Sequence, residues 1–135
     1  QLGMGKVKFF SGDGTCTPKL PELASKVAAV ANVTCATGGI AVEKMAGGQD
    51  WKKRYDAKFP GQFQIYSPYA YYATMVLVDA MKRANSVDPK VYIPALQKTN
   101  FKGLTAQIQF TPKGELTHPA VTLNTFKNNV RTPLN

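Results

Sequence analysis

The sequence is poor in the residues from which catalytic and metal sites are built. It contains one histidine and two cysteines in 135 residues. The histidine, His118, precedes a proline in a polar segment, which is typical of a solvated loop, and it lies far along the chain from both cysteines. No zinc-ligand spacing, Gly-x-Ser-x-Gly motif or phosphate loop is present. We therefore expect no metal, no cofactor and no catalytic residue.

Long apolar runs are also missing. The longest apolar stretches are broken by Asp79, Lys82 and Arg83, so we expect no segment that could span a bilayer. The first five residues lack both the charged and the apolar region of a signal peptide. We expect any such peptide to have been removed or to lie upstream of Gln1.

Acidic residues are few, at eight against 17 lysines and arginines, which gives a net charge of +9. A basic balance suggests nucleic acid as a partner, but only three of the positive charges are arginine, the residue best suited to base and phosphate recognition. The one tight basic cluster, residues 52–54, shares its expected helix with Asp50 and Asp56. The charge therefore indicates solvated surface lysines and no nucleic-acid partner.

The two cysteines, Cys16 and Cys35, each follow or end an apolar run, and would lie near one sheet edge if those runs are neighbouring strands. One interpretation is a disulfide formed in an oxidising compartment. Another is a pair of buried thiols in a cytosolic protein. A third is a thiol enzyme that uses Cys16 near a helix start, although no base stands beside it in the sequence.

Apolar periodicity and turn residues predict an alternation of strands and helices. The helix over residues 17–30 has Thr17 as its N-cap and Pro18 at its first position. We expect a turn at residues 100–103 and a hairpin turn at Asn128 and Asn129. The expected strands cover residues 6–11, 32–37, 63–66, 104–110 and 121–126, and the expected helices cover residues 17–30, 50–59, 68–84 and 88–98. This order indicates an α/β fold.

The first strand stops at Ser-Gly-Asp-Gly, which holds Asp13 at the strand's carboxyl end. Ligands of open α/β sheets bind at this edge, and a lone carboxylate there suits a small cation such as an amino group. The alternative is a structural Asx-turn, with Gly12 and Gly14 supplying positive φ angles. Four tyrosines cluster over residues 66–72; packing explains each of them, but Tyr66, in a loop before a helix, is the one we expect to contact a ligand.

Four segments carry a resemblance to a known family. The chain resembles the C-terminal part of periplasmic branched-chain amino acid-binding proteins, the substrate-binding components of ABC transporters. The matching segments are KVKFFSGDGTCTPKLPELA, YSPYAYYATMVLVDAMKRANSVDP, ALQKTNFKGLTAQIQFTPKGEL and VTLNTFKNNVRTPL. The resemblance implies a portion of a two-lobed type I periplasmic-binding fold with Rossmann-like sheets.

The resemblance also implies a function. Asp13, flanked by Gly12, would contact the ammonium group of a branched-chain or similar small amino acid. The protein would be periplasmic, would not be an enzyme, and would deliver its ligand to a membrane permease. Cys16 and Cys35 would form a disulfide.

Such proteins are longer than this chain, so the resemblance implies that an N-terminal part is missing. Residues 1–37 and 119–135 would belong to the second lobe and residues 38–118 to the first, with hinge crossings near 38–39 and 117–119. The chain alone would bind weakly or not at all. The rival hypothesis is a compact α/β interaction module that docks a partner chain through its tyrosine-rich surface.

Overall fold

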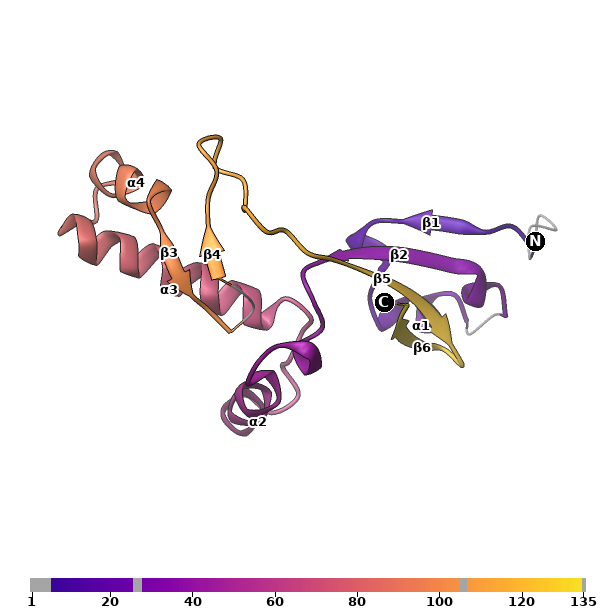
Figure 1. Ribbon diagram of the computed structural model, residues 1–135. Coiled ribbons are helices and arrows are strands. Elements are labelled where there is room, and N and C mark those ends of the chain that lie inside the picture. Colours follow the sequence, from indigo (N-terminus) through magenta and orange to yellow (C-terminus); the bar gives the residue numbers. More distant parts are fainter. Residues whose placement is uncertain (1–5, 26–27, 105–106, 135) are drawn as a thin grey trace. The chain divides into compact units, whose positions relative to one another are not determined.

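The chain forms two compact units. The computed structural model describes residues 6–25, 28–104 and 107–134 (Figure 1). Unit 1 consists of Gln1–Gly39 together with Ala120–Asn135, and unit 2 consists of Ile40–Pro119. In the part of the chain that the structure describes, no helix is both long and apolar enough to cross a membrane.

Unit 1 is built on a four-stranded sheet. Its strands are β1 (Phe9–Ser11), β2 (Val33–Gly38), β5 (Val121–Lys127) and β6 (Val130–Pro133), and they lie in the order β1-β2-β5-β6. β1 and β2 are parallel, whereas β5 is antiparallel to both β2 and β6. The sheet therefore joins the two ends of the chain, with β1 at one edge.

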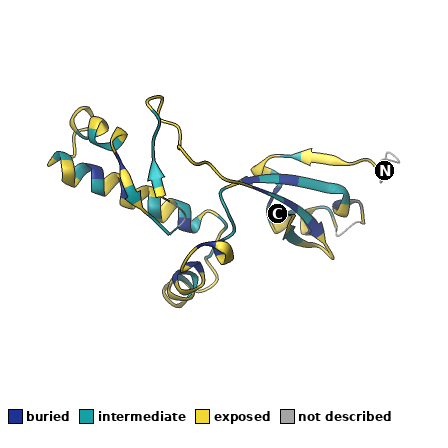
Figure 2. Ribbon diagram, viewed as in Figure 1, coloured by how far each residue is buried: buried dark blue, intermediate teal, exposed yellow. Residues whose placement is uncertain are grey.

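The hairpin between β5 and β6 follows directly from the sequence. Asn128 and Asn129 have φ angles of 50° and 62°. Two consecutive left-handed residues form the turn that best matches the twist of paired strands, and asparagine tolerates this conformation. Along β5 every second residue is buried, as the alternating sequence requires (Figure 2). The expected strand and hairpin turn are confirmed.

The expected helix over residues 17–30 is wrong. Among the described residues of this range, the chain forms the short helix α1 (Lys19–Leu23) and then the 3-10 helix η2 (Ala28–Asn32). Thr17 is not the cap, because Pro18 occupies that position without a side-chain hydrogen bond. Ser25 has a φ of 54°, which ends the helical path. Residues 26 and 27 of this expected helix lie outside the described residues.

A disulfide stands at the centre of unit 1. Cys16 and Cys35 are bonded, with a Cα–Cα distance of 5.5 Å, and both are fully buried. Val30 and Phe126 complete the buried cluster around them. Of the alternatives, the disulfide is therefore the one the structure contains, and a nucleophilic thiol at Cys16 is ruled out because its sulfur is bonded.

Unit 2 is mainly helical. It also contains a two-stranded antiparallel sheet formed by residues 100–102 and 107–109. Its elements are the 3-10 helix η3 (Val42–Lys44), α2 (Gly48–Lys58), α3 (Ser67–Ala84), α4 (Pro89–Gln97), β3 (Asn100–Lys102) and β4 (Gln107–Gln109). Val42, Met45 and Trp51 form its buried cluster. Together the two units give the mixed α/β fold that the sequence predicts.

Three expectations for unit 2 need correction. Residues 100–102 form β3 rather than a turn, because they pair with β4 further along the chain. Residues 63–66 form no strand; residues 65 and 66 are in a turn, and Phe63, before it, packs against Tyr55. Residues 105 and 106 of the strand expected over residues 104–110 lie outside the described residues. The described part of that range contains β4 and a bridge between Phe110 and Leu116.

Candidate functional site

Asp13 lies at the carboxyl end of β1. Ser11, the last residue of β1, is paired with Cys35 of the parallel strand β2. Gly12 follows, and Asp13 then begins the 3-10 helix η1 (Asp13–Thr15). Because parallel strands present their carboxyl ends at the same edge, the exposed Asp13 side chain lies at the edge where α/β sheets bind ligands.

The backbone around Asp13 is fixed by three kinds of contact. The Asp13 carbonyl accepts a hydrogen bond of 2.9 Å from the Cys16 amide. The Thr15 hydroxyl donates to the Ser11 hydroxyl at 2.5 Å. The Cys16–Cys35 disulfide then ties the end of this turn to β2. The position of Asp13 is therefore set before any ligand arrives.

The fold does not explain the glycine at position 12. Gly12 has φ −82° and ψ −167°, an extended conformation open to every residue. The expectation that Gly12 and Gly14 supply positive φ angles is therefore wrong, because neither has one. A Cβ atom built at Gly12 or Gly14 would meet nothing within 4 Å. The glycines leave open space on both sides of Asp13.

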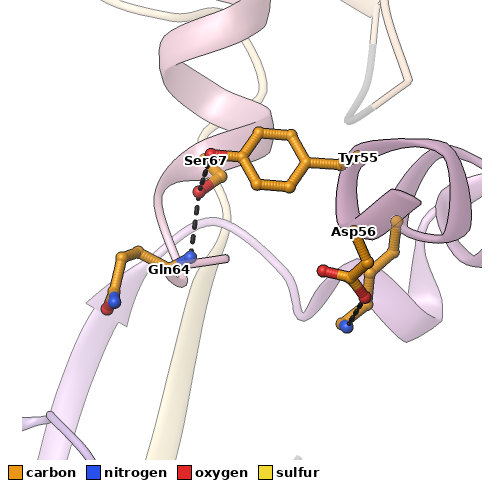
Figure 3. Close-up of polar contacts among 5 residues, drawn as sticks. Tyr55, Asp56, Gln64 and Ser67 are labelled. Atoms are coloured by element: carbon orange, nitrogen blue, oxygen red, sulfur yellow. Dashed lines mark hydrogen bonds and ion pairs between the residues drawn. The ribbon is translucent and has the colours of Figure 1, made fainter. Parts of the chain in front are cut away.

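Tyr66 belongs to unit 2, at the N-cap position of α3, and its side chain is 37% exposed. The turn that carries it is held by the Ser67 hydroxyl, which accepts a hydrogen bond of 2.9 Å from the Gln64 amide (Figure 3). The same hydroxyl lies 3.5 Å from the hydroxyl of Tyr55 on α2. The structure thus brings Gly12 and Asp13 together in unit 1 and places Tyr66 in the other unit.

Sequence reasoning missed the polar contact made by Tyr69. Its hydroxyl accepts a hydrogen bond of 2.6 Å from the Ile40 amide and donates one of 2.7 Å to the Ile40 carbonyl. Burial raises the pKa of Tyr69 above 10.0, and the backbone hydrogen bond to Ile40 opposes that rise. Its ring also contacts that of Tyr66, with centroids 6.3 Å apart. The tyrosine cluster in the sequence drew attention to residues 66–72, but it did not indicate that Tyr69 would bind the Ile40 backbone.

The part of the chain that the structure describes also contains the remaining sequence candidates: potential metal ligands, the histidine and the basic cluster. No group of three or more histidine, cysteine, aspartate or glutamate residues comes close enough there to hold a metal ion. His118 is exposed, with Nδ1 3.0 Å from the Thr117 hydroxyl. In the basic cluster on α2, Lys52 forms an ion pair with Asp56.

The family comparison and the structural comparison both identify periplasmic binding proteins. Residues 3–128 match the family described as periplasmic binding protein. The leucine-binding protein LivK from Thermotoga maritima is similar in structure, with a TM-score of 0.78 and 25% identity over 96% of this chain and 37% of LivK. LivJ from Streptococcus pneumoniae, solved with isoleucine, has a TM-score of 0.72 and 18% identity over 98% of this chain and 38% of LivJ.

A substrate-binding protein from Desulfitobacterium hafniense, solved with leucine, has a TM-score of 0.73 and 15% identity over 96% of this chain and 36% of that protein. A search of curated proteins found no match. The chain spans less than two fifths of the length of these solved structures. The matched family is one of solute-binding proteins and not of enzymes. With a match over nearly its whole length, the chain belongs to the periplasmic binding protein family and carries part of the type I fold.

Proposed function

We propose that this chain supplies part of the binding site for a branched-chain or similar small amino acid, which the complete protein delivers to the permease of an ABC transporter from the periplasm. The observation that carries the proposal is the exposed carboxylate of Asp13 at the carboxyl edge of the parallel pair β1 and β2. Family membership and the amino acid ligands named for LivK, LivJ and the Desulfitobacterium protein support it.

Asp13 would bind the ammonium group of the ligand. A carboxylate accepting from an ammonium forms a charge-assisted hydrogen bond, which is shorter and stronger than a neutral one. The open space at Gly12 would let the ligand approach the backbone beside Asp13. Tyr66 would add an apolar wall with a polar tip.

The two units would correspond to parts of two lobes. Unit 1 would belong to the second lobe and unit 2 to the first, with the crossings near residues 39–40 and 119–120 acting as hinges. The polypeptide that the longer relatives have and this chain lacks would complete both lobes and bind the ligand's carboxylate. On this basis the isolated chain holds only half of the site.

Calorimetry tests the first consequence. We expect no detectable heat of leucine binding by the isolated chain, because a ligand held by Asp13 alone remains largely hydrated. Tight leucine binding by these 135 residues would contradict the assignment of half a site.

A chimera tests the role of Asp13. This chain would replace the matching 37% of Thermotoga LivK, and leucine affinity would be measured by calorimetry on protein shown to unfold cooperatively. We expect the chimera to bind leucine and Asp13→Asn to weaken binding at least about 30-fold, because it leaves the ammonium without its countercharge.

The matched control is Asp50→Asn, an exposed aspartate in the first turn of α2, which should leave the affinity unchanged. If Asp13→Asn binds as well as the unchanged chimera, Asp13 has no role in the site. If the folded chimera binds none of leucine, isoleucine and valine, the proposed ligand class is wrong.

The apolar surface of β1 favours a second candidate, a module that docks a partner chain. Phe9 and Phe10 are 55% and 67% exposed, although their side chains point to opposite faces of the strand. Light scattering, which measures the oligomeric state of the purified chain, distinguishes this docking module from the proposed part of an amino acid-binding protein. A stable monomer that needs no further polypeptide would favour the self-contained module over part of a larger fold.

A further inference from the structure

The chain passes from unit 1 to unit 2 between Gly39 and Ile40, and Gly39 is fully engaged in unit 1. Its amide donates a hydrogen bond of 2.7 Å to the Ala120 carbonyl. Its carbonyl accepts one of 2.7 Å from the hydroxyl of Thr122 on β5. Its φ of 83° is a conformation that glycine adopts readily. The last residue of this segment in unit 1 therefore has both of its backbone groups bound.

Ile40 is just as fully engaged in unit 2. One hydroxyl, that of Tyr69, accepts from its amide at 2.6 Å and donates to its carbonyl at 2.7 Å. A tyrosine hydroxyl has one proton to donate, and here it goes to the Ile40 carbonyl. Tyr69 lies in the first turn of α3, and its ring packs against the cluster of Val42, Met45 and Trp51. Ile40 is thereby fixed to α3, the longest helix described in its unit.

In this crossing no residue without backbone hydrogen bonds separates the two units. The residue bound in unit 1 and the residue bound in unit 2 are consecutive, and the peptide between them is planar. The return crossing differs. Thr117 is held by its amide, 3.0 Å from the Gln109 carbonyl, and Ala120 by the amide of Gly39, so His118 and Pro119 separate the two held points.

We propose that Tyr69 is a positioning residue for the first crossing: its hydroxyl holds both backbone groups of Ile40 against α3, so that the chain enters unit 2 at a fixed point. Because the Gly39 carbonyl and the Ile40 amide belong to the same planar peptide and both are hydrogen-bonded, this crossing is a held peptide and not a flexible linker. The ring contact between Tyr69 and Tyr66 places this fixed point beside the residue we propose as a ligand wall. Tyr69 holds Ile40 in this way whatever the ligand is.

Amide hydrogen exchange of the labelled chain, followed by NMR, tests the clamp. In the unchanged protein the Ile40 amide should be protected. In Tyr69→Phe, which keeps the ring and its packing, we expect the Ile40 amide to exchange about 2- to 12-fold faster and the Ile40 carbonyl ¹³C shift to move. The Gly39 amide should be unchanged, because its acceptor is the Ala120 carbonyl.

Tyr72→Phe is the matched control. Tyr72 lies on the same helix and is partly buried, but its hydroxyl makes no hydrogen bond within the described residues. Tyr72→Phe should leave Ile40 and the unfolding midpoint reported by Trp51 fluorescence unchanged. Tyr69→Phe should lower that midpoint slightly, because the Ile40 backbone groups lose their hydrogen-bond partner. An unprotected Ile40 amide in the unchanged protein would overturn the proposal without any variant. So would an effect of Tyr69→Phe spread equally over all of unit 2.

Discussion

Gly12 is a glycine that the fold of this chain does not require. Its backbone is extended and the space where a Cβ would lie is empty. We predict that Gly12→Ala raises the free energy of unfolding by about 0.4–1 kcal/mol, because alanine restricts the unfolded chain at no cost to the folded one. Urea denaturation checks this, and in the LivK chimera the same substitution should weaken leucine binding by filling the ligand's space.

Gly48 is the matched contrast. It is buried at the start of α2, where a Cβ would lie 1.8 Å from the Val42 carbonyl oxygen. Since that neighbour is backbone and cannot turn aside, Gly48→Ala should destabilise unit 2 by at least about 1–3 kcal/mol. A Gly12→Ala variant that is destabilised as strongly as Gly48→Ala would mean that the turn before Asp13 is tightly packed, and would remove the argument for ligand space.

Helix α4 depends on a side-chain cap. Asp88 accepts a hydrogen bond of 2.9 Å from the Lys90 amide, and Pro89 opens the helix at a position that needs no donor. We predict that Asp88→Ala lowers the free energy of unfolding by about 1 kcal/mol. Urea denaturation followed by Trp51 fluorescence measures this within the same unit. Asp50→Ala in α2, where Gly47 is the N-cap, should cost less; equal losses would show that general charge and not capping is responsible.

Local signals predicted those elements that local contacts build. The helix expected over residues 68–84 is observed as α3 (Ser67–Ala84), because a proline at its start and a long apolar sequence agree with each other. The prediction of a helix over residues 17–30 was wrong, although that segment also has a proline at its expected start. Leu23, an apolar residue within that range, is 82% exposed, and the positive φ of Ser25 ends the helical path two residues later.

Elements that rest on distant partners could not be predicted in the same way. β3 has only three residues, and its pairing with β4 leaves no local pattern. The same contrast holds for the candidate site. Asp13 could be located because a strand, glycines and a carboxylate are adjacent in the sequence. The Tyr69 clamp could not, because it joins residues 29 positions apart through one hydroxyl.

The two units have separate buried cores, and only one of them contains the disulfide. Trp51, the single tryptophan, lies in the other core, so its fluorescence reports unit 2 alone. Closing the nineteen-residue separation between Cys16 and Cys35 is worth about 3 kcal/mol in the chain-entropy model. We predict that Cys16→Ala with Cys35→Ala destabilises unit 1 by about this amount and leaves unit 2 unchanged.

Two probes on the same samples check this prediction. Carbonyl ¹³C signals of β5 should be lost at lower urea in the double variant, while the midpoint from Trp51 fluorescence stays where it is. A common shift of both midpoints would show that the units unfold as one cooperative body.

The hydrogen bond between Gly39 and Ala120 also bears on the order in which the protein folds during synthesis. It brings together the two ends of residues 40–119, which stand between the paired strands β2 and β5. Closing a flexible loop of that length costs roughly 4 kcal/mol. A chain emerging from the ribosome has β2 long before β5, so its sheet stays open until the intervening unit has been made. Once that unit is folded, its residues no longer behave as a flexible loop, so the entropic cost of pairing β5 with β2 is smaller.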